Sequence, residues 1–261
     1  MMRGKRGYGW VPDRPDQRDY LYSAIRPVVR LPKKVDLREF CSVVENQEAL
    51  GSCTANALAG NLEYLDKKGI TKNNTPRRRP PATYGVYEDV SRLFIYYNER
   101  VLEGTVDYDS GASLRDGIKT LRKQGACWEK TWPYLIERFT MKPSKKCYME
   151  AKKHQIESYH RINNLPEMLT CLAEGYPFVF GFTVYESFQS QRVAKTGVAN
   201  MPKKKEKVLG GHAVMAVGYN RRQKKFIVRN SWGTKWGKEG YFTMPYEYLE
   251  TLSADFWTIR R

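Results

Sequence analysis

The spacing of apolar residues changes near the middle of the chain, and this change constrains the fold more than any other feature. Helical spacing is found at 52–69, 91–102 and 113–123. Apolar, β-branched runs that predict strands are found at 178–184, 211–219, 226–230 and 240–244. Helices and strands segregated in this way predict an α+β fold with two lobes, a helical one at about 40–140 and a β-rich one at about 141–261. We expect the functional cleft between these lobes.

The composition supports a globular protein without a membrane span. Apolar residues make up 41% of the 261 residues, and no stretch approaches the roughly 20 apolar residues that a spanning helix needs. The basic start, Met1–Tyr8, is not followed by an apolar core, so we see no secretory signal. These features predict a protein that stays in the cytoplasm or is exported without such a signal.

The formal net charge of +17 favours contact with anionic surfaces, such as nucleic acid, acidic lipid or acidic protein. The basic runs are scattered along the chain, however, and no recognised nucleic-acid-binding motif accompanies them. A well-solvated surface is therefore the favoured interpretation, with an anionic ligand on the basic surface as the alternative.

The cysteines argue against a metal site. There are five of them, at Cys41, Cys53, Cys127, Cys147 and Cys171, without a CxxC pair, and the chain has only three histidines. We expect neither a metal nor an organic cofactor. Cys127 and Cys147 could form a disulfide, and the spacing alone leaves their state open.

Cys53 has the position of an activated nucleophile. It falls in the first turn of the predicted helix, after Ser52 as a candidate N-cap and before Gly69, which should end the helix. The positive end of the helix dipole would stabilise the thiolate there. The alternative is a buried structural cysteine, which is the more common role of a lone cysteine.

Three further residues could complete a catalytic site, although each has an ordinary structural interpretation. His212 begins an apolar strand after two glycines, and Asn230 at the end of the next strand could accept its ring N–H. Trp232 could shield that bond from water. Gln47, six residues before Cys53, could donate a hydrogen bond to an oxyanion, with the Cys53 backbone N–H as a second donor.

Together these segments resemble the papain family of cysteine peptidases. The matching motifs are the cysteine segment 47–53, the histidine strand 210–214, the asparagine block 230–241, the mature-like start 31–38 and Trp-Pro-Tyr at 132–134. The asparagine block, NSWGTKWGKEGY, is the longest and most specific of these. The resemblance covers about residues 31–245.

The resemblance implies a papain-like two-lobe fold and a cysteine endopeptidase. Cys53 would attack a peptide carbonyl, His212 would act as base and acid, Asn230 would hold the imidazole, and Gln47 would stabilise the oxyanion. By the same resemblance, substrate would bind along Gly111, Gly211 and Trp232. We expect protein or peptide substrates and a monomer.

The chain also departs from the family pattern. Leu50 replaces a cysteine of the usual disulfide, Thr54 replaces an aromatic residue, and only Ser110-Gly111 stands where the family has a Gly-Gly strip. His212 and Asn230 are each separated from Cys53 by more residues than the roughly 130–150 that are typical of the family. An insertion in the arginine-rich loop at 71–83 would account for the excess.

Residues 1–30 precede the peptidase-like domain 31–261 and form an unusually short leader. Their aromatic, Pro- and Asp-rich pattern resembles that of bacterial papain-like enzymes of the xylellain type, and the prolines discourage a regular helix. The segment could cross the cleft as an inhibitory propeptide, which would make the chain a zymogen, or could be a permanent structural arm.

Other activities remain compatible with these residues. An exopeptidase could use paired histidines, but we expect His154 and His160 to lie on a solvated helix. A ligase or transpeptidase would share the same acyl-enzyme. A binding protein on a papain scaffold is a hypothesis from another class, which the complete set of Gln47, Cys53, His212 and Asn230 disfavours.

Overall fold

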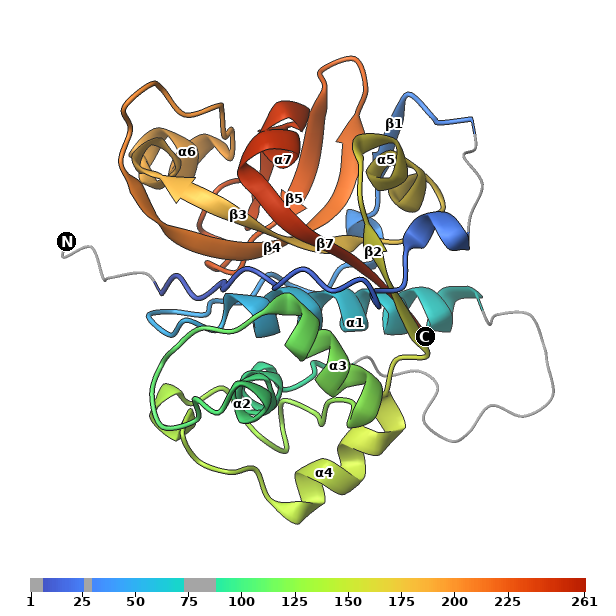
Figure 1. Ribbon diagram of the computed structural model, residues 1–261, viewed down its shortest axis with the longest axis vertical. Helices are drawn as coiled ribbons and strands as arrows, with labels where there is room; N and C mark the ends of the chain where they lie inside the picture. Colours follow the sequence, from blue (N-terminus) through green and yellow to red (C-terminus); the bar gives the residue numbers. More distant parts are fainter. Residues whose placement is uncertain (1–6, 26–29, 73–87) are drawn as a thin grey trace.

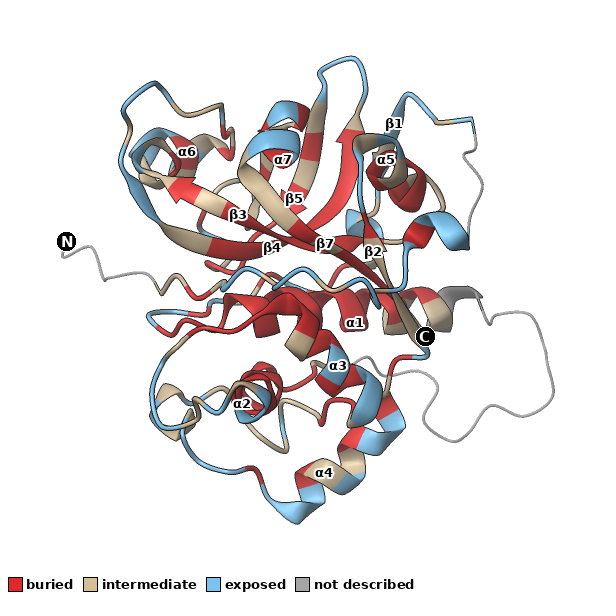
Figure 2. Ribbon diagram, in the orientation of Figure 1, coloured by how far each residue is buried: buried red, intermediate tan, exposed pale blue. Residues whose placement is uncertain are grey.

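A long buried helix, α1 (Cys53–Lys72), lies between a layer of strands and a layer of helices in the computed structural model (Figure 1), which describes residues 7–25, 30–72 and 88–261. Every residue of α1 from Cys53 to Leu65 is buried (Figure 2). A helix that is buried on all sides contacts both layers and holds its first turn rigidly between them. Cys53 is the first residue of that turn.

The helical layer contains α2 (Arg92–Glu103), α3 (Leu114–Lys123) and α4 (Lys145–Ala151). The Ser91 hydroxyl accepts the N–H of Phe94 at the start of α2, and Ser113 caps α3 in the same way. Gly104, with φ of 70°, ends α2 in the left-handed conformation that favours glycine. Sequence and local geometry therefore agree on the ends of these helices.

In the part of the chain that the structure describes, the other layer is one antiparallel sheet of seven strands. Its order is β2-β7-β3-β4-β5-β6, and β1 also pairs with β4. The strands are β1 (Lys34–Asp36), β2 (Ser158–Ile162), β3 (Phe178–Tyr185), β4 (Val208–Asn220), β5 (Lys225–Arg229), β6 (Tyr241–Pro245) and β7 (Ser253–Arg260). The remaining helices are α5 (Leu165–Ala173), α6 (Gln191–Thr196) and α7 (Tyr246–Leu252), and the 3-10 turns are η1 (Tyr22–Ala24), η2 (Arg38–Phe40), η3 (Ile136–Arg138), η4 (Lys152–His154) and η5 (Glu186–Gln189).

Strand β4 joins two hydrophobic cores because its side chains alternate between the faces of the sheet. Ala213 and Met215 pack into the core that α1 shares with the helical layer, whereas Val214 and Ala216 pack into the core on the opposite face. This alternation fixes the register of β4, and with it the position of His212, whose strand partner is Phe182.

The N-terminal segment, dark blue in Figure 1, runs in extended form between the two layers. The Trp10 N–H donates to Gly211 O at 3.1 Å, and the Val11 N–H donates to Ala112 O at 3.0 Å. One strand of the sheet and one loop of the helical layer therefore both bind this segment.

Residues further along the segment are integrated into the fold. Tyr22 is 1% exposed and packs into the core beside α5, and Asp19 forms ion pairs with Arg115 at 2.6 Å and Arg161 at 2.8 Å. A buried tyrosine and a carboxylate shared by two guanidinium groups fix this part of the segment firmly.

The predicted helices at 52–69, 91–102 and 113–123 and the four predicted strands are confirmed, with ends that differ by a few residues. Gly69 does not end α1, since the helix continues to Lys72. One glycine in a helix costs only about 1 kcal/mol, which the packing of α1 outweighs. The placement of His154 and His160 on a solvated helix is wrong: His154 is buried in η4 against Trp128, and His160 is in β2.

The proposed insertion at 71–83 lies outside the described residues except for Thr71 and Lys72, which continue α1. The boundaries 1–30, 31–261 and the change of lobe near residue 140 stay predictions.

Candidate active site

Cys53 begins α1 and has no exposed surface. Its thiol accepts hydrogen bonds from the backbone N–H groups of Ala213, Gly9 and Thr54. The Ala213 contact places the sulfur at the strand that carries His212. Burial raises the pKa of Cys53 to about 11 despite these hydrogen bonds, so the thiol is neutral in this arrangement.

His212 and Asn230 meet where β4 pairs with the end of β5. The Nε2 atom of His212 lies 2.8 Å from Oδ1 of Asn230, and both residues are buried. The Trp232 ring stacks on the imidazole, with 4.8 Å between ring centroids and 23° between planes. The amide thus orients the ring, and the indole lies against one face of the imidazole.

Gln47 is completely buried, and its amide has a defined orientation. Its Oε1 accepts the Ser231 hydroxyl at 2.5 Å, and its Nε2 donates to Leu50 O at 2.9 Å and to Gly7 O at 3.1 Å. The amide N–H₂ group therefore faces a peptide carbonyl of the N-terminal segment, as an oxyanion-stabilising donor would face the carbonyl of a bound peptide.

The three residues predicted to bind substrate all contact the N-terminal segment. A Cβ on Gly111 would lie 2.2 Å from Gly9 O, and a Cβ on Gly211 would lie 2.7 Å from Trp10 O. The Tyr8 ring makes edge contacts with His212 and Trp232, at centroid distances of 6.2 and 6.4 Å. Glycine at 111 and 211 thus permits the close approach of a peptide backbone.

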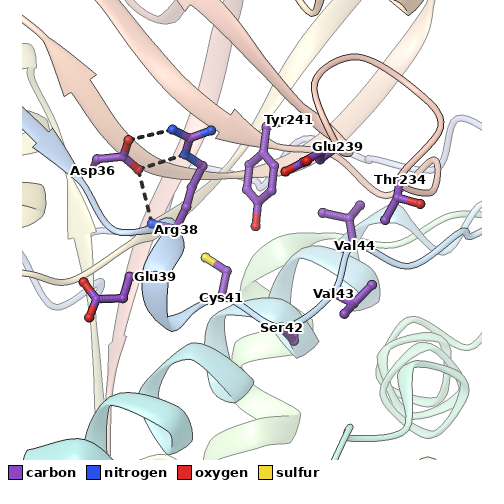
Figure 3. Close-up of a pocket in the computed structure, with 10 residues that line it drawn as sticks. All are labelled: Asp36, Arg38, Glu39, Cys41, Ser42, Val43, Val44, Thr234, Glu239 and Tyr241. Carbon is purple, nitrogen blue, oxygen red and sulfur yellow. Dashed lines mark hydrogen bonds and ion pairs between the residues drawn. The ribbon is translucent and has the colours of Figure 1, made fainter.

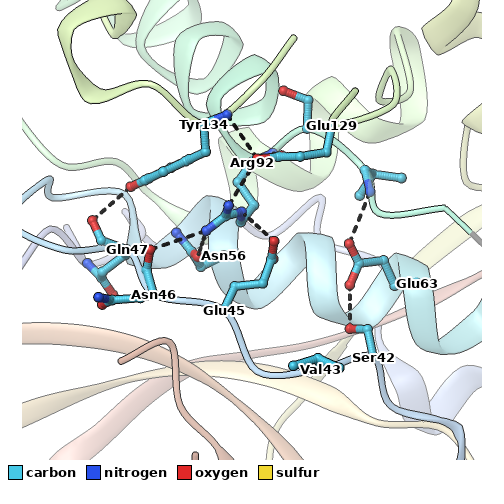
Figure 4. A network of polar contacts seen from close by, with 12 residues as sticks. Ser42, Val43, Glu45, Asn46, Gln47, Asn56, Glu63, Arg92, Glu129 and Tyr134 are labelled. Atoms are coloured by element: carbon cyan, nitrogen blue, oxygen red, sulfur yellow. Dashed lines mark hydrogen bonds and ion pairs between the residues drawn. The ribbon is translucent and has the colours of Figure 1, made fainter. Parts of the chain in front are cut away.

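A polar network beneath Gln47 was not predicted from the sequence (Figure 4). The Arg92 guanidinium lies between the carboxylates of Glu45 and Glu129, at 3.0 Å from each, and its central carbon lies 4.0 Å from the centre of the Tyr134 ring. Burial raises the pKa of Glu45 to about 8, with the neighbouring Arg92 opposing the shift.

Tyr134 links this network to the site. Its hydroxyl donates to Gln47 O at 2.9 Å and lies 2.6 Å from Ser52 Oγ. Tyr134 therefore supports both the segment that carries Gln47 and the residue before Cys53. The Trp-Pro-Tyr motif at 132–134 was the available signal, but its spacing does not reveal these contacts.

A separate cavity of about 820 Å³ lies between η2 with its following loop and the segment that precedes β6 (Figure 3). Its lining includes Arg38, Cys41, Val44, Glu239 and Tyr241, and it contains none of the predicted site residues.

Among the described residues, no group of three or more His, Cys, Asp or Glu side chains could hold a metal ion. Within the same residues, no helix is long and apolar enough to cross a membrane.

Comparison with known proteins agrees with this arrangement. The sequence model described as papain family cysteine protease matches residues 109–252. The crystal structure of xylellain, a cysteine protease from Xylella fastidiosa, is similar over 100% of this chain and 98% of its own, with 41% identity and a TM-score of 0.85. An uncharacterized peptidase C1-like protein of Acanthamoeba polyphaga mimivirus is 42% identical over 98% of this chain and 87% of its own length.

More distant similarities extend the comparison. A cysteine protease of Arabidopsis thaliana is 28% identical over 88% of this chain, which spans 60% of that protein's length. The structure of a bromelain protease from Ananas comosus is 23% identical, with a TM-score of 0.64, and supports the fold alone. The fold is the α+β fold of papain-like cysteine peptidases. The chain belongs to the papain family of cysteine proteases.

Proposed function

We propose that the chain is a cysteine endopeptidase that hydrolyses peptide bonds through an acyl-enzyme on Cys53. The observation that carries this proposal is the docking of the chain's own peptide at the site. The Gly7 carbonyl binds the Gln47 amide, and the Gly9 N–H reaches the Cys53 thiol. The site therefore has the shape and the donors to hold a peptide backbone next to a nucleophile.

The mechanism follows from these positions. His212, held by Asn230, takes the proton of Cys53, and the thiolate attacks the substrate carbonyl. The Gln47 amide and the Cys53 backbone N–H stabilise the tetrahedral oxyanion. The imidazolium protonates the leaving amine and then, as a neutral base, activates water to hydrolyse the thioester. Burial raises the pKa of Cys53, so in this proposal the ion pair forms once the N-terminal residues leave and the thiol becomes exposed to solvent.

We propose further that the N-terminal segment has two parts with different roles. Residues 7–11 cover Cys53 and lie against Gly111 and Gly211, where we expect substrate to bind, so they block substrate. Residues 13–25 include the buried Tyr22 and the Asp19 ion pairs, which make them a structural arm. In this proposal the chain is a zymogen whose blocking residues must leave the cleft while the arm stays in place.

Hydrolysis of a fluorogenic peptide library under reducing conditions tests the proposed activity. Removing residues 1–30 would also remove Tyr22 from the core, so the substitution Gly9→Ala is the better way to open the cleft. We expect Gly9→Ala to cleave peptides and Gly9→Ala/Cys53→Ala to be inactive. An inactive Gly9→Ala protein with an accessible Cys53 would favour a binding scaffold. Amide synthesis from the same acyl-enzyme, in the presence of an added amine nucleophile, would identify a ligase.

A further inference from the structure

Two buried cysteines outside the active site contact each other. Cys127 follows α3, and Cys147 belongs to α4. Neither has exposed surface, and both pack with Phe94 and Ala151 in one small cluster. The two thiols are close enough for Cys147 to raise the pKa of Cys127, and neither cysteine is in a disulfide in this structure. Two cysteines of one small packed cluster can form a disulfide where their Cα atoms lie within about 7 Å of each other.

We propose that Cys127 and Cys147 form a structural disulfide when the protein meets a disulfide oxidant such as oxidised glutathione. One thiolate attacks the glutathione disulfide and releases one reduced glutathione. The second thiol then displaces the other glutathione from this mixed disulfide. The two protein thiols lose two protons and two electrons, one S–S bond forms, and one glutathione disulfide becomes two glutathione molecules.

The other cysteines have different surroundings. Cys53 and Cys41 pack in the core around α1, and Cys171 packs on the far face of the sheet. The Cys41 thiol donates to Leu37 O at 3.7 Å, and the Cys171 thiol donates to Tyr176 O at 3.4 Å. Of the ten pairings that five cysteines allow, the cluster therefore favours Cys127 with Cys147.

The disulfide would fix a loop that supports the active site. It would close a ring of about 20 residues that includes Glu129 and Tyr134. Glu129 binds Arg92 at 3.0 Å, and the Tyr134 hydroxyl binds Gln47 O at 2.9 Å. A crosslink between the two ends of the loop restricts its opening and therefore stabilises the position of Tyr134 under Gln47.

Burial makes the reaction slow. It raises the pKa of Cys127, with the adjacent Cys147 contributing to the shift, so little thiolate exists and the oxidant reaches it only when the loop opens. The same burial would limit the access of reductants to the disulfide once it has formed. We therefore expect a bridge that forms slowly and persists, unlike an exposed redox-sensing pair.

The test uses the full-length chain carrying Cys53→Ala, so that the nucleophile does not react. The protein is incubated with excess oxidised glutathione in mild urea and quenched with acid, and its remaining thiols are then alkylated in denaturant at neutral pH. We expect a mass loss of two hydrogen atoms, a crosslinked peptide containing Cys127 and Cys147, and a Tm higher by roughly 6–12 °C that dithiothreitol reverses. Cys127→Ala and Cys147→Ala should each abolish the mass loss.

Cys171→Ala is the matched control, because it removes an equally buried thiol and should leave the crosslink intact. Three results would overturn the proposal: alkylation of both Cys127 and Cys147 after prolonged oxidation, a crosslink to another cysteine, or a crosslink that lowers the Tm. The experiment requires no peptidase activity, so its outcome is independent of the proposed function.

Discussion

The substitution Gly9→Ala tests whether the N-terminal residues block the site. A Cβ on Gly9 would lie 1.7 Å from Gly51 O and 2.4 Å from Gly51 C, both backbone atoms that cannot rotate away. The docked backbone must therefore leave its place. It would lose at least the three hydrogen bonds that Gly7 O, Gly9 O and the Trp10 N–H make with Gln47, Ala112 and Gly211. At about 1 kcal/mol each, these three bonds amount to about 3 kcal/mol.

A free-energy change of this size raises the fraction of molecules whose cleft is open roughly 100-fold. If Cys53 reacts only in the open state, its alkylation rate at neutral pH should rise by the same factor. The assay is site-specific iodoacetamide labelling of Cys53, measured by mass spectrometry in the folded protein. Gly69→Ala is the matched control, since no atom of the described residues lies within 4 Å of the added methyl group, and its labelling rate should equal that of the wild type. An unchanged rate in folded Gly9→Ala would refute the reasoning.

Three further predictions concern the site and its support, and the two that need turnover use the Gly9→Ala protein. Gln47→Ala removes one oxyanion donor and should lower kcat by about 100- to 1000-fold while KM changes little, as steady-state kinetics would measure. Tyr134→Phe removes the hydroxyl that binds Gln47 O and Ser52 Oγ, and should lower the free energy of unfolding by about 1–2 kcal/mol with a several-fold loss in kcat. Burial and the neighbouring Asp13 raise the pKa of Asp255 to about 6, so the folded state binds its proton more tightly than the unfolded state. The stability that protonated Asp255 contributes is therefore present at pH 4 and lost as the pH rises through 6, so the Tm of the wild-type protein should fall over this range. Asp255→Asn in the wild-type background should make that fall in Tm smaller.

The sequence predicts the elements of the fold where the periodicity is strong. The buried stretch of α1 and the apolar runs of β3 to β6 are long enough to identify from the chain alone. The strands β1, β2 and β7 and the short helices α4 to α7 were not predicted, because their residues depend on tertiary contacts more than on local pattern. Thr258 in β7 illustrates this, since it is completely buried and bonds to Pro177 O.

In the site too, the features that follow from sequence motifs were predicted, whereas those that depend on tertiary contacts were not. The positions of His212, Asn230 and Trp232 agree with the predicted geometry, because the motif order fixes which strand ends meet. The raised pKa of Cys53 was not predicted, since it depends on the burial of the thiol in the folded chain, which outweighs the hydrogen bonds that the thiol accepts. The position of Arg92 between Glu45 and Glu129 was not predicted from the sequence either.

The endopeptidase activity, the monomeric state, the location in the cell and an anionic ligand for the surface with net charge +17 are still predictions.

The most direct test of the account is peptide hydrolysis by the Gly9→Ala protein, compared with the Gly9→Ala/Cys53→Ala protein under reducing conditions. The account predicts cleavage by the first and none by the second, because the open cleft exposes a nucleophile that only Cys53 supplies. Equal cleavage by both would contradict the assignment of Cys53. No cleavage by Gly9→Ala, with Cys53 readily alkylated, would contradict the proposed peptidase activity itself.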